Sequence, residues 1–211
     1  MLTIIERKNS ENPLNGQTKT QVKTTTKSAQ QIKRALVIVF DGIEEVEALA
    51  PVDILRRAGV EVVMAGVSQQ STVEGRNGIR FQADQALNEI DPSAFDLLFL
   101  PGGPGVVPLA ENKSVIRLLQ NFDLQSKWVT AICAAPKVLA QAGILDDRPA
   151  TGHSSVRAEL PIPSDDRIVQ SDHILTSQGA GTAVEFGLRL AAVLTDEETA
   201  QAVAESIHAI Q

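Results

Sequence analysis

Residues 128–139 read Trp-Val-Thr-Ala-Ile-Cys-Ala-Ala-Pro-Lys-Val-Leu and contain the only cysteine of the chain, Cys133. The apolar run up to Ile132 predicts a buried strand that ends on the sulfur. Small residues follow, and Pro136 stands where the first turn of a helix tolerates proline. A strand, a sharp turn and a helix in this order make a nucleophile elbow, which lifts one side chain clear of a sheet.

Two interpretations of this cysteine follow from the local pattern. The start of the helix aims unpaired backbone N–H groups at the sulfur of Cys133, which favours the thiolate over the thiol. Alternatively, Cys133 is a buried structural thiol, because free cysteine is among the most buried residue types. The rest of the chain decides between them.

The composition limits the kind of protein. The chain has 211 residues, of which 43% are hydrophobic, and this predicts one globular domain with a substantial core. We expect no membrane partner, since charged residues break every apolar run before it reaches spanning length. A single cysteine excludes an internal disulfide framework, and a free thiol suits a reducing, cytoplasmic compartment. The net charge of −7 argues against a nucleic-acid partner.

The charge is unevenly distributed along the chain. Residues 1–31 carry a net charge of +3, whereas the remainder carries −10. The first segment is rich in Gln, Thr and Lys after Ile5 and lacks the apolar residues needed to bury a core face. We therefore expect a basic polar tail at 1–31, disordered and without a signal peptide, followed by a single domain at 32–211. An organelle transit peptide is only weakly suggested.

Strand and helix patterns alternate after the tail. Strands are expected at 35–40, 60–65 and 96–100, and helices at 44–58 and 113–124 and from the Cys133 turn to 142. Pro51 should kink the first helix or divide it into two pieces. Asn77-Gly78 predicts a hairpin turn. A short β pair at 167–169 and 173–176 precedes closing helices at 181–194 and 196–207, with Thr195 as a cap between them.

This alternation predicts an α/β fold in which helices cover both faces of a parallel sheet. In such sheets the functional site lies at the carboxyl ends of the strands, near the point where the strand order switches. Three of the expected strand ends carry unusual residues, namely 41–47, the Pro-Gly-Gly-Pro-Gly turn at 101–105, and Cys133. Their convergence favours a reactive cysteine over a structural one.

Glu47 and two backbone amides are the expected partners of the sulfur. Glu47 falls on the apolar side of its helix with Ala50 and Ile54, which is unusual for a solvated glutamate. A carboxyl group beside a sulfur can donate a hydrogen bond when protonated or accept a proton when ionised. The 101–105 turn exposes backbone N–H groups that, with the N–H of Ala134, could form an oxyanion hole.

The histidines and the remaining motifs narrow the chemistry. His153 follows the Cys133 helix and could fold back over the thiol as a general acid or base, whereas His173 and His208 are expected to be structural. No cluster with metal-ligand spacing occurs, and neither does a Walker loop or a GxGxxG fingerprint. We expect neither a metal nor another cofactor.

At these residues the chain resembles the ThiJ/PfpI superfamily, in the branch of the parkinsonism-associated deglycase. The resemblance runs from about Lys33 to the C-terminus. It is carried, in order, by 34–38, Glu44-Glu45-Val46-Glu47, 51–59, Leu100-Pro101-Gly102-Gly103, 131–136 and 175–182.

The resemblance implies a flavodoxin-like three-layer α/β sandwich with a mostly parallel central sheet that forms a homodimer. It also implies that Cys133 is the nucleophile, that Glu47 is its carboxyl partner, and that Gly103 and Ala134 line the oxyanion pocket. His153 matches a family position that is often histidine. Relatives have been assigned cofactor-free glyoxalase, deglycase, holdase chaperone and oxidative-stress-sensing activities.

Some positions depart from the family pattern. Ala180 replaces a proline that is common between the two glycines, and Asn77 stands where relatives often place Arg or His. These departures bear on the rim of the pocket and on contacts on the dimer side. The protease-like branch places histidine directly after the cysteine, where this chain has Ala134, and the late His-x-Glu pair of glutamine amidotransferases is absent.

Two functions remain. The first is an enzyme of the glyoxalase III or protein deglycase type, which acts on methylglyoxal, glyoxal or their glycated adducts. The alternative is a non-enzymatic oxidative-stress sensor or redox-controlled chaperone in which Cys133 is oxidised. A third interpretation, an inert member kept for dimerisation, requires an unreactive thiol.

Overall fold

The computed structural model describes residues 5–6, 23–24, 32–68 and 70–209. Contacts divide the chain into residues 1–32 and Lys33–Gln211, one residue from the boundary predicted from charge. In the first unit, β1 (Ile5–Glu6) pairs antiparallel with β2 (Lys23–Thr24). The prediction that this tail is disordered stays a prediction, because most of its residues lie outside those described.

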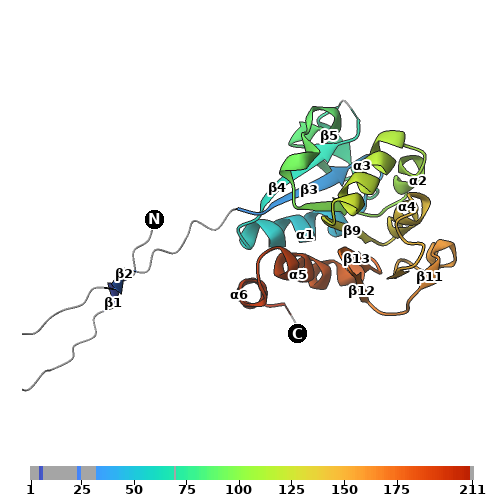
Figure 1. Ribbon diagram of the computed structural model, residues 1–211. Coiled ribbons are helices and arrows are strands. Elements are labelled where there is room, and N and C mark those ends of the chain that lie inside the picture. The colour runs from blue at the N-terminus through green and yellow to red at the C-terminus, as the bar shows by residue number, and fades with distance from the viewer. Residues whose placement is uncertain (1–4, 7–22, 25–31, 69, 210–211) are drawn as a thin grey trace, which may run out of the picture. The chain divides into compact units, whose positions relative to one another are not determined.

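A seven-stranded sheet forms the centre of the described part of the second unit (Figure 1). Every neighbouring pair in it is parallel except the first, which is antiparallel. In spatial order its strands are β12 (Ile168–Ser171), β13 (Ile174–Ser177), β9 (Trp128–Ile132), β8 (Leu97–Leu100), β3 (Arg34–Val39), β4 (Glu61–Gly66) and β7 (Gln85–Ala86).

Helices lie on both faces of this sheet. In Figure 1, α5 (Ala183–Leu194) and α6 (Glu197–Ser206) lie beside α1 (Glu45–Arg57). The other group comprises α2 (Val106–Leu109), α3 (Lys113–Leu124) and α4 (Pro136–Gln141). Strands β3, β8, β9 and β13 are completely or almost completely buried, because helices cover them from both sides. The predicted three-layer, mostly parallel α/β architecture is therefore confirmed.

Short elements complete the domain. A hairpin joins β5 (Thr72–Glu74) to β6 (Arg80–Gln82), and its turn contains Gly78 at a φ of +83°. Away from it, β10 (Pro149–Ala150) pairs with β11 (Ile162–Pro163). Single 3₁₀ turns cover η1 (Leu87–Glu89), η2 (Pro92–Ala94), η3 (Arg157–Glu159) and η4 (Ala180–Thr182).

The strand order places the functional edge of the sheet. Strands β4, β3, β8, β9 and β13 lie side by side in the 2-1-3-4-5 order of flavodoxin-like sheets, whose order reverses between the first and third strands, here β3 and β8. The loops that follow β3 and β8 meet there, since Glu44 N–H donates to Gly102 O (3.0 Å) and Gly105 N–H to Gly42 O (3.1 Å).

Two local predictions are only partly right. Pro51 does not divide the first helix, because α1 continues from Glu45 to Arg57 with the proline inside it, and the kink stays a prediction. Thr195 is the C-cap of α5 but does not cap the start of the last helix. Its hydroxyl donates back to Ala191 O, whereas Asp196 caps α6 by accepting from Thr199 N–H at 2.7 Å. A carboxylate at this position also interacts favourably with the helix dipole.

Candidate functional site

Cys133 occupies a strained turn between β9 and α4. Its φ is +65°, a left-handed conformation that is uncommon for a residue with a side chain and is often found at functional sites. Two hydrogen bonds hold this backbone: Cys133 N–H donates to Ser177 O (2.9 Å), and Cys133 O accepts from His153 N–H (2.8 Å). The predicted nucleophile elbow is therefore present, and it is fixed from both sides.

The surroundings of the sulfur combine backbone amides with close glycine contacts. The thiol is half-buried, and the N–H groups of Gly103 and Ala134 form hydrogen bonds with it. Gly102 must be a glycine, since a Cβ there would lie 2.6 Å from Cys133 Cβ and would overlap the Glu47 carboxyl group. The structure thus brings together the two amides that the sequence predicted as oxyanion donors.

Glu47 projects from the first turn of α1 toward Cys133 and is only 2% exposed. Burial raises the pKa of Glu47 to about 7, and the charge of Glu44 adds to this effect. Hydrogen bonds from the Cys133 thiol and from the N–H groups of Ala180 and Gly102 act in the opposite direction on this pKa. A carboxyl group at this position is therefore poised to take or return a proton near neutral pH.

The thiol itself is harder to ionise than the sequence predicts. Burial, the negative charge of Glu47 and the hydrogen bond to Glu47 raise the pKa of Cys133 to about 12, and the N–H groups of Ala134 and Gly103 only partly offset this. The expectation that the start of the helix yields a ready thiolate is therefore wrong. Because the negative charge of Glu47 makes ionisation of the Cys133 thiol less favourable, the two groups are not both ionised near neutral pH.

The two groups consequently behave as one unit. Between the pKa of Glu47, about 7, and that of Cys133, about 12, the pair holds one proton. When that proton lies on sulfur, Glu47 is a carboxylate. When it moves to Glu47, the sulfur becomes a thiolate that accepts hydrogen bonds from the carboxyl group and the two amides. Nucleophilic attack requires the second arrangement.

Cys133 borders two adjoining cavities of about 410 and 390 Å³. One extends past Glu44, Glu47 and Gly179 toward Arg167, and the other past Gly103, Ala134 and Lys137 toward Glu159. Arg76 and His153 line both cavities. The structure thus brings His153 to the same site as Cys133, whereas His173 lies apart and pairs with Asp123 at 2.8 Å.

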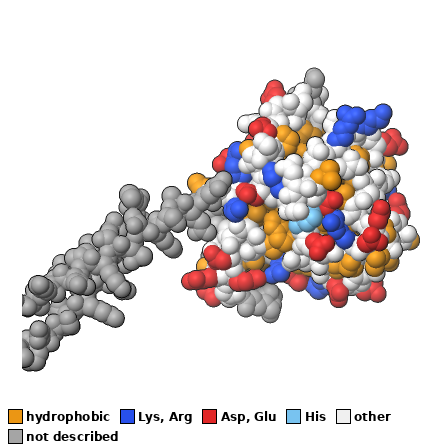
Figure 2. All heavy atoms as spheres, viewed as in Figure 1, with side chains coloured by type: hydrophobic (Ala, Val, Ile, Leu, Met, Phe, Trp, Pro, Cys, Tyr) orange, Lys and Arg blue, Asp and Glu red, His pale blue; other side chains and the backbone are white. Residues whose placement is uncertain are grey.

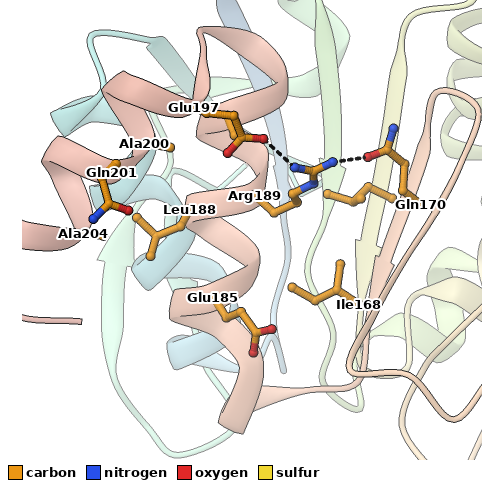
Figure 3. A pocket seen from close by; sticks show the side chains of 11 residues that line it. Ile168, Gln170, Glu185, Leu188, Arg189, Glu197, Ala200, Gln201 and Ala204 are labelled. Carbon is orange, nitrogen blue, oxygen red and sulfur yellow. Dashed lines mark hydrogen bonds and ion pairs between the residues drawn. The ribbon is translucent and has the colours of Figure 1, made fainter. Parts of the chain in front are cut away.

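A separate groove of about 530 Å³ lies between β12 and the helices α5 and α6 (Figure 3). Arg189 crosses it and hydrogen-bonds to Glu197 and Gln170, both at 2.8 Å. None of its lining residues lines either cavity at Cys133. On the face of the molecule seen in Figure 2, acidic and basic side chains are interspersed.

We place the candidate site at Cys133 rather than in this groove, because the cavities at Cys133 contain the nucleophile and its partner Glu47.

Arg76 is a site residue that the sequence did not reveal. Its backbone N–H donates to Ile43 O (2.8 Å), and its guanidinium pairs with the Glu44 carboxylate at 3.3 Å. The Asn77-Gly78 pair predicted the hairpin turn, but it did not predict that this turn would place Arg76 beside the cavities at Cys133. Long-range packing, which no local pattern encodes, brings this cation to the mouth of the site.

The two departures from the family pattern have structural roles. Asn77 anchors the hairpin, since its side chain donates to the Glu45 carboxylate at 2.8 Å and its backbone N–H to the same group at 2.8 Å. Although burial raises the pKa of Glu45, these hydrogen bonds outweigh it and lower that pKa. Ala180 retains a backbone N–H that a proline would lack, and this N–H is bonded to Glu47.

The described residues hold no group of three or more His, Cys, Asp or Glu side chains that could bind a metal. Nor does this part of the chain contain a helix long and apolar enough to cross a bilayer.

Comparison with known proteins agrees with this geometry. The sequence model of the DJ-1/PfpI family matches residues 33–193. The glutathione-independent glyoxalase DJR-1.2 of Caenorhabditis elegans is 36% identical over 171 residues, which cover 79% of this chain and 91% of that protein. The crystal structure of Drosophila melanogaster DJ-1beta has a TM-score of 0.82 at 33% identity, with 86% of this chain and 100% of the other covered.

A structure of oxidized DJ-1 from Toxoplasma gondii has a TM-score of 0.80 at 32% identity, with 83% and 98% of the two chains covered. These similarities extend over most of the region that forms the α/β domain and include the elbow, the Glu47 helix and the glycine turn. The chain therefore belongs to the DJ-1/PfpI family.

Proposed function

We propose that this protein is a cofactor-independent glyoxalase III or deglycase that acts on methylglyoxal, glyoxal or their adducts. The observation that carries the proposal is the arrangement of Cys133, the buried Glu47 carboxyl and the Gly103 and Ala134 amides around one sulfur. A nucleophile, a base near neutral pKa and two oxyanion donors are the groups that addition to a carbonyl requires. The relationship to a named glutathione-independent glyoxalase supports the same reaction class.

The reaction begins when Glu47 accepts the thiol proton and the thiolate attacks the aldehyde carbon. The new C–S bond places negative charge on the aldehyde oxygen, which the two amides stabilise until Glu47 passes the former thiol proton to it. This step gives a hemithioacetal and makes Glu47 a carboxylate again. Glu47 then removes the hydrogen from this carbon and returns a proton to the neighbouring carbon, with a proton moving between the two oxygens. The product is a thioester of the hydroxy acid, and water hydrolyses it to release the acid and the thiol.

A glutathione-free assay tests this proposal. We expect the full chain to convert methylglyoxal to lactate without glutathione, and Cys133→Ser to abolish turnover. Glu47→Gln should lower kcat by at least about 100-fold, as is typical for loss of a general base. Glu198→Gln, an exposed change on α6, serves as the matched control. Absence of lactate, or equal turnover by Cys133→Ser, would overturn the proposal.

A peroxide sensor or redox-controlled chaperone is the second candidate. The half-buried sulfur interacts with the buried Glu47 carboxyl group, whose Oε2 has no hydrogen-bond partner among the described residues. Two equivalents of hydrogen peroxide would convert the thiol through sulfenate to sulfinate, releasing water at each step, and protonated Glu47 would then donate to a sulfinate oxygen. Intact mass after mild peroxide should show two added oxygens, and Glu47→Gln should reduce this product.

The remaining parts of the proposal concern the setting of the enzyme. We propose a homodimer that works in the cytoplasm, where a free thiol persists. Its partners are small aldehydes or glycated adducts rather than nucleic acid or membrane. We also propose that residues 1–31 form a separate polar tail, since their charge and composition differ from those of 32–211.

A further inference from the structure

We propose that Ser155 fixes the tautomer of His153, so that the imidazole presents an Nε2–H donor to the substrate cavity rather than a basic nitrogen. The catalytic part of this inference rests on the proposed aldehyde chemistry. The tautomer itself follows from local geometry alone.

Two contacts of the same ring nitrogen define the tautomer. The backbone N–H of Ser155 donates to His153 Nδ1 at 3.2 Å, and the Ser155 hydroxyl lies 2.8 Å from that nitrogen. A backbone amide can only donate, so Nδ1 must offer its lone pair. A neutral imidazole carries one proton on its two nitrogens, and this proton must therefore lie on Nε2. In this tautomer the hydroxyl and the amide share the single lone pair of Nδ1.

The backbone around the ring holds this geometry relative to the nucleophile. His153 N–H donates to Cys133 O at 2.8 Å, and Val156 N–H donates to His153 O at 3.0 Å, which closes a turn over Ser155. Before this turn, Thr151 N–H is bonded to the Thr176 hydroxyl at 2.9 Å. The segment that carries His153 and Ser155 is thus tied to the elbow and to β13.

The charged groups around His153 do not supply an alternative acceptor for a proton on Nδ1. The ring lines one cavity with Glu44, Glu47, Arg76 and Arg167, and the other with Arg76, Lys137 and Glu159. The contact at Nδ1 is with Ser155, and a second proton on this nitrogen would face the donating amide.

The consequence is a division of labour in the proposed reaction. Glu47 removes and returns the carbon-bound proton, as its position beside Cys133 requires. His153 keeps its Nε2 proton and donates a hydrogen bond to the oxygen on which negative charge develops. Neutral imidazole can stabilise an enediolate in this way without itself being protonated. Ser155 does not touch the substrate in this account and is a positioning residue.

Long-range ¹H–¹⁵N correlation spectra of the ¹⁵N-labelled full chain test the tautomer directly. The signals of the His153 ring are assigned by their loss in His153→Gln. At pH 8 they should show an unprotonated Nδ1 and a protonated Nε2. In Ser155→Ala, which loses the hydroxyl but keeps the donating amide, we expect the Nε2–H tautomer to remain the major form and the other tautomer to become detectable. Ser155→Thr, which retains the hydroxyl, should restore the wild-type pattern. Ser154→Ala is the matched control, because this adjacent exposed serine makes no hydrogen bond to the ring.

Kinetics on methylglyoxal test the catalytic role. We expect Ser155→Ala to lower kcat about five- to tenfold with little change in KM, the effect of losing one hydrogen bond, and Ser155→Thr to recover it. A protonated Nδ1 in the wild-type spectrum would overturn the tautomer assignment even if the enzyme is active. If the chain lacks glyoxalase activity while Nε2 is protonated, the proposed function fails but the assignment stands. Equal kcat in Ser155→Ala and wild type would remove the positioning role.

Discussion

At the scale of single residues, the chemistry depends on one proton shared between Cys133 and Glu47. Neither group is activated by itself, because burial raises both pKa values and the negative charge of Glu47 raises that of Cys133 further. The sequence predicted both residues from an elbow and an oddly placed acid, but not which of them holds the proton. That balance depends on distances and desolvation in the folded chain, and local patterns do not contain this information.

The raised pKa of Glu47 should make stability depend on pH. The carboxyl group has an ordinary pKa of 4.5 and a folded value of about 7, so the folded protein retains a proton that the unfolded chain loses between these values. The resulting stabilisation is complete below pH 4.5 and disappears as the pH rises through 7. Glu47→Gln lacks this dependence. Between pH 4.5 and 8, urea unfolding should show wild-type stability falling by about 3 kcal/mol relative to the variant.

Parallel stability curves for the two proteins across this range would mean that Glu47 is already ionised in the folded state. The comparison should stop at pH 8, because above it the Cys133 thiol begins to differ between the folded and unfolded states.

Replacing Ala180 with proline should change the pKa of Glu47 without removing any reacting group. Ala180 is the first residue of η4, where proline is tolerated, but its N–H is bonded to Glu47 and lowers that pKa. In Ala180→Pro the midpoint of the kcat/KM profile should move about half to one unit higher in pH, as expected for one hydrogen bond. Ala180→Ser retains the N–H and should keep the wild-type midpoint. An unmoved midpoint in the proline variant would exclude this contact.

At the scale of elements, the packing of α5 on α1 holds Glu47 in position. Gly187 of α5 faces Pro51 and Ile54 of α1, and a Cβ on it would lie 2.9 Å from Pro51 Cα. Gly187→Ala should therefore lower the free energy of unfolding by about 1–2 kcal/mol, despite the better helix propensity of alanine. Gly181→Ala, where a Cβ meets nothing within 4 Å, is the control. Similar urea midpoints for both variants would show that the helices separate easily.

Element boundaries were predictable where residues with specific backbone preferences mark them. The α3 helix begins after Asn112, whose side chain caps it, and α1 ends before Gly59 at a φ of +79°. The Thr195 and Pro51 predictions were each half right. Thr195 ends α5 while Asp196 caps the start of α6, and α1 continues through Pro51 to Arg57 without being divided. The two-residue strands carry too little pattern to be recognised from sequence.

At the scale of the whole molecule, the proposed homodimer predicts a specific interface. Val46 on α1 is 50% exposed and Val184 on α5 is 42% exposed, and Val184 lines a surface cavity to which both helices and residues 206–209 contribute. We expect light scattering to give twice the mass of one chain, and Val184→Glu to give the monomer mass because it would bury a charge. A monomeric wild type, or an unaffected dimer in the variant, would contradict this interface.

The sequence predicted which strand ends would meet, because the carboxyl ends of parallel strands converge at one edge of a sheet. It did not predict Arg76, which lies in the hairpin between β5 and β6, or Ser155, which lies in the loop between β10 and η3. The positions of such connecting segments relative to the sheet are not fixed by a doubly wound fold. The framework of the site was therefore predictable, but its rim was not.

The rate of Cys133 alkylation by iodoacetamide as a function of pH tests the central claim most directly. If Glu47 takes the thiol proton, the rate should rise through about pH 7 and then remain level to at least pH 10, because the pair holds one proton between about 7 and about 12. A rate that instead increases about tenfold per pH unit from 7 to 10 would show that the thiol ionises alone, and would contradict the account.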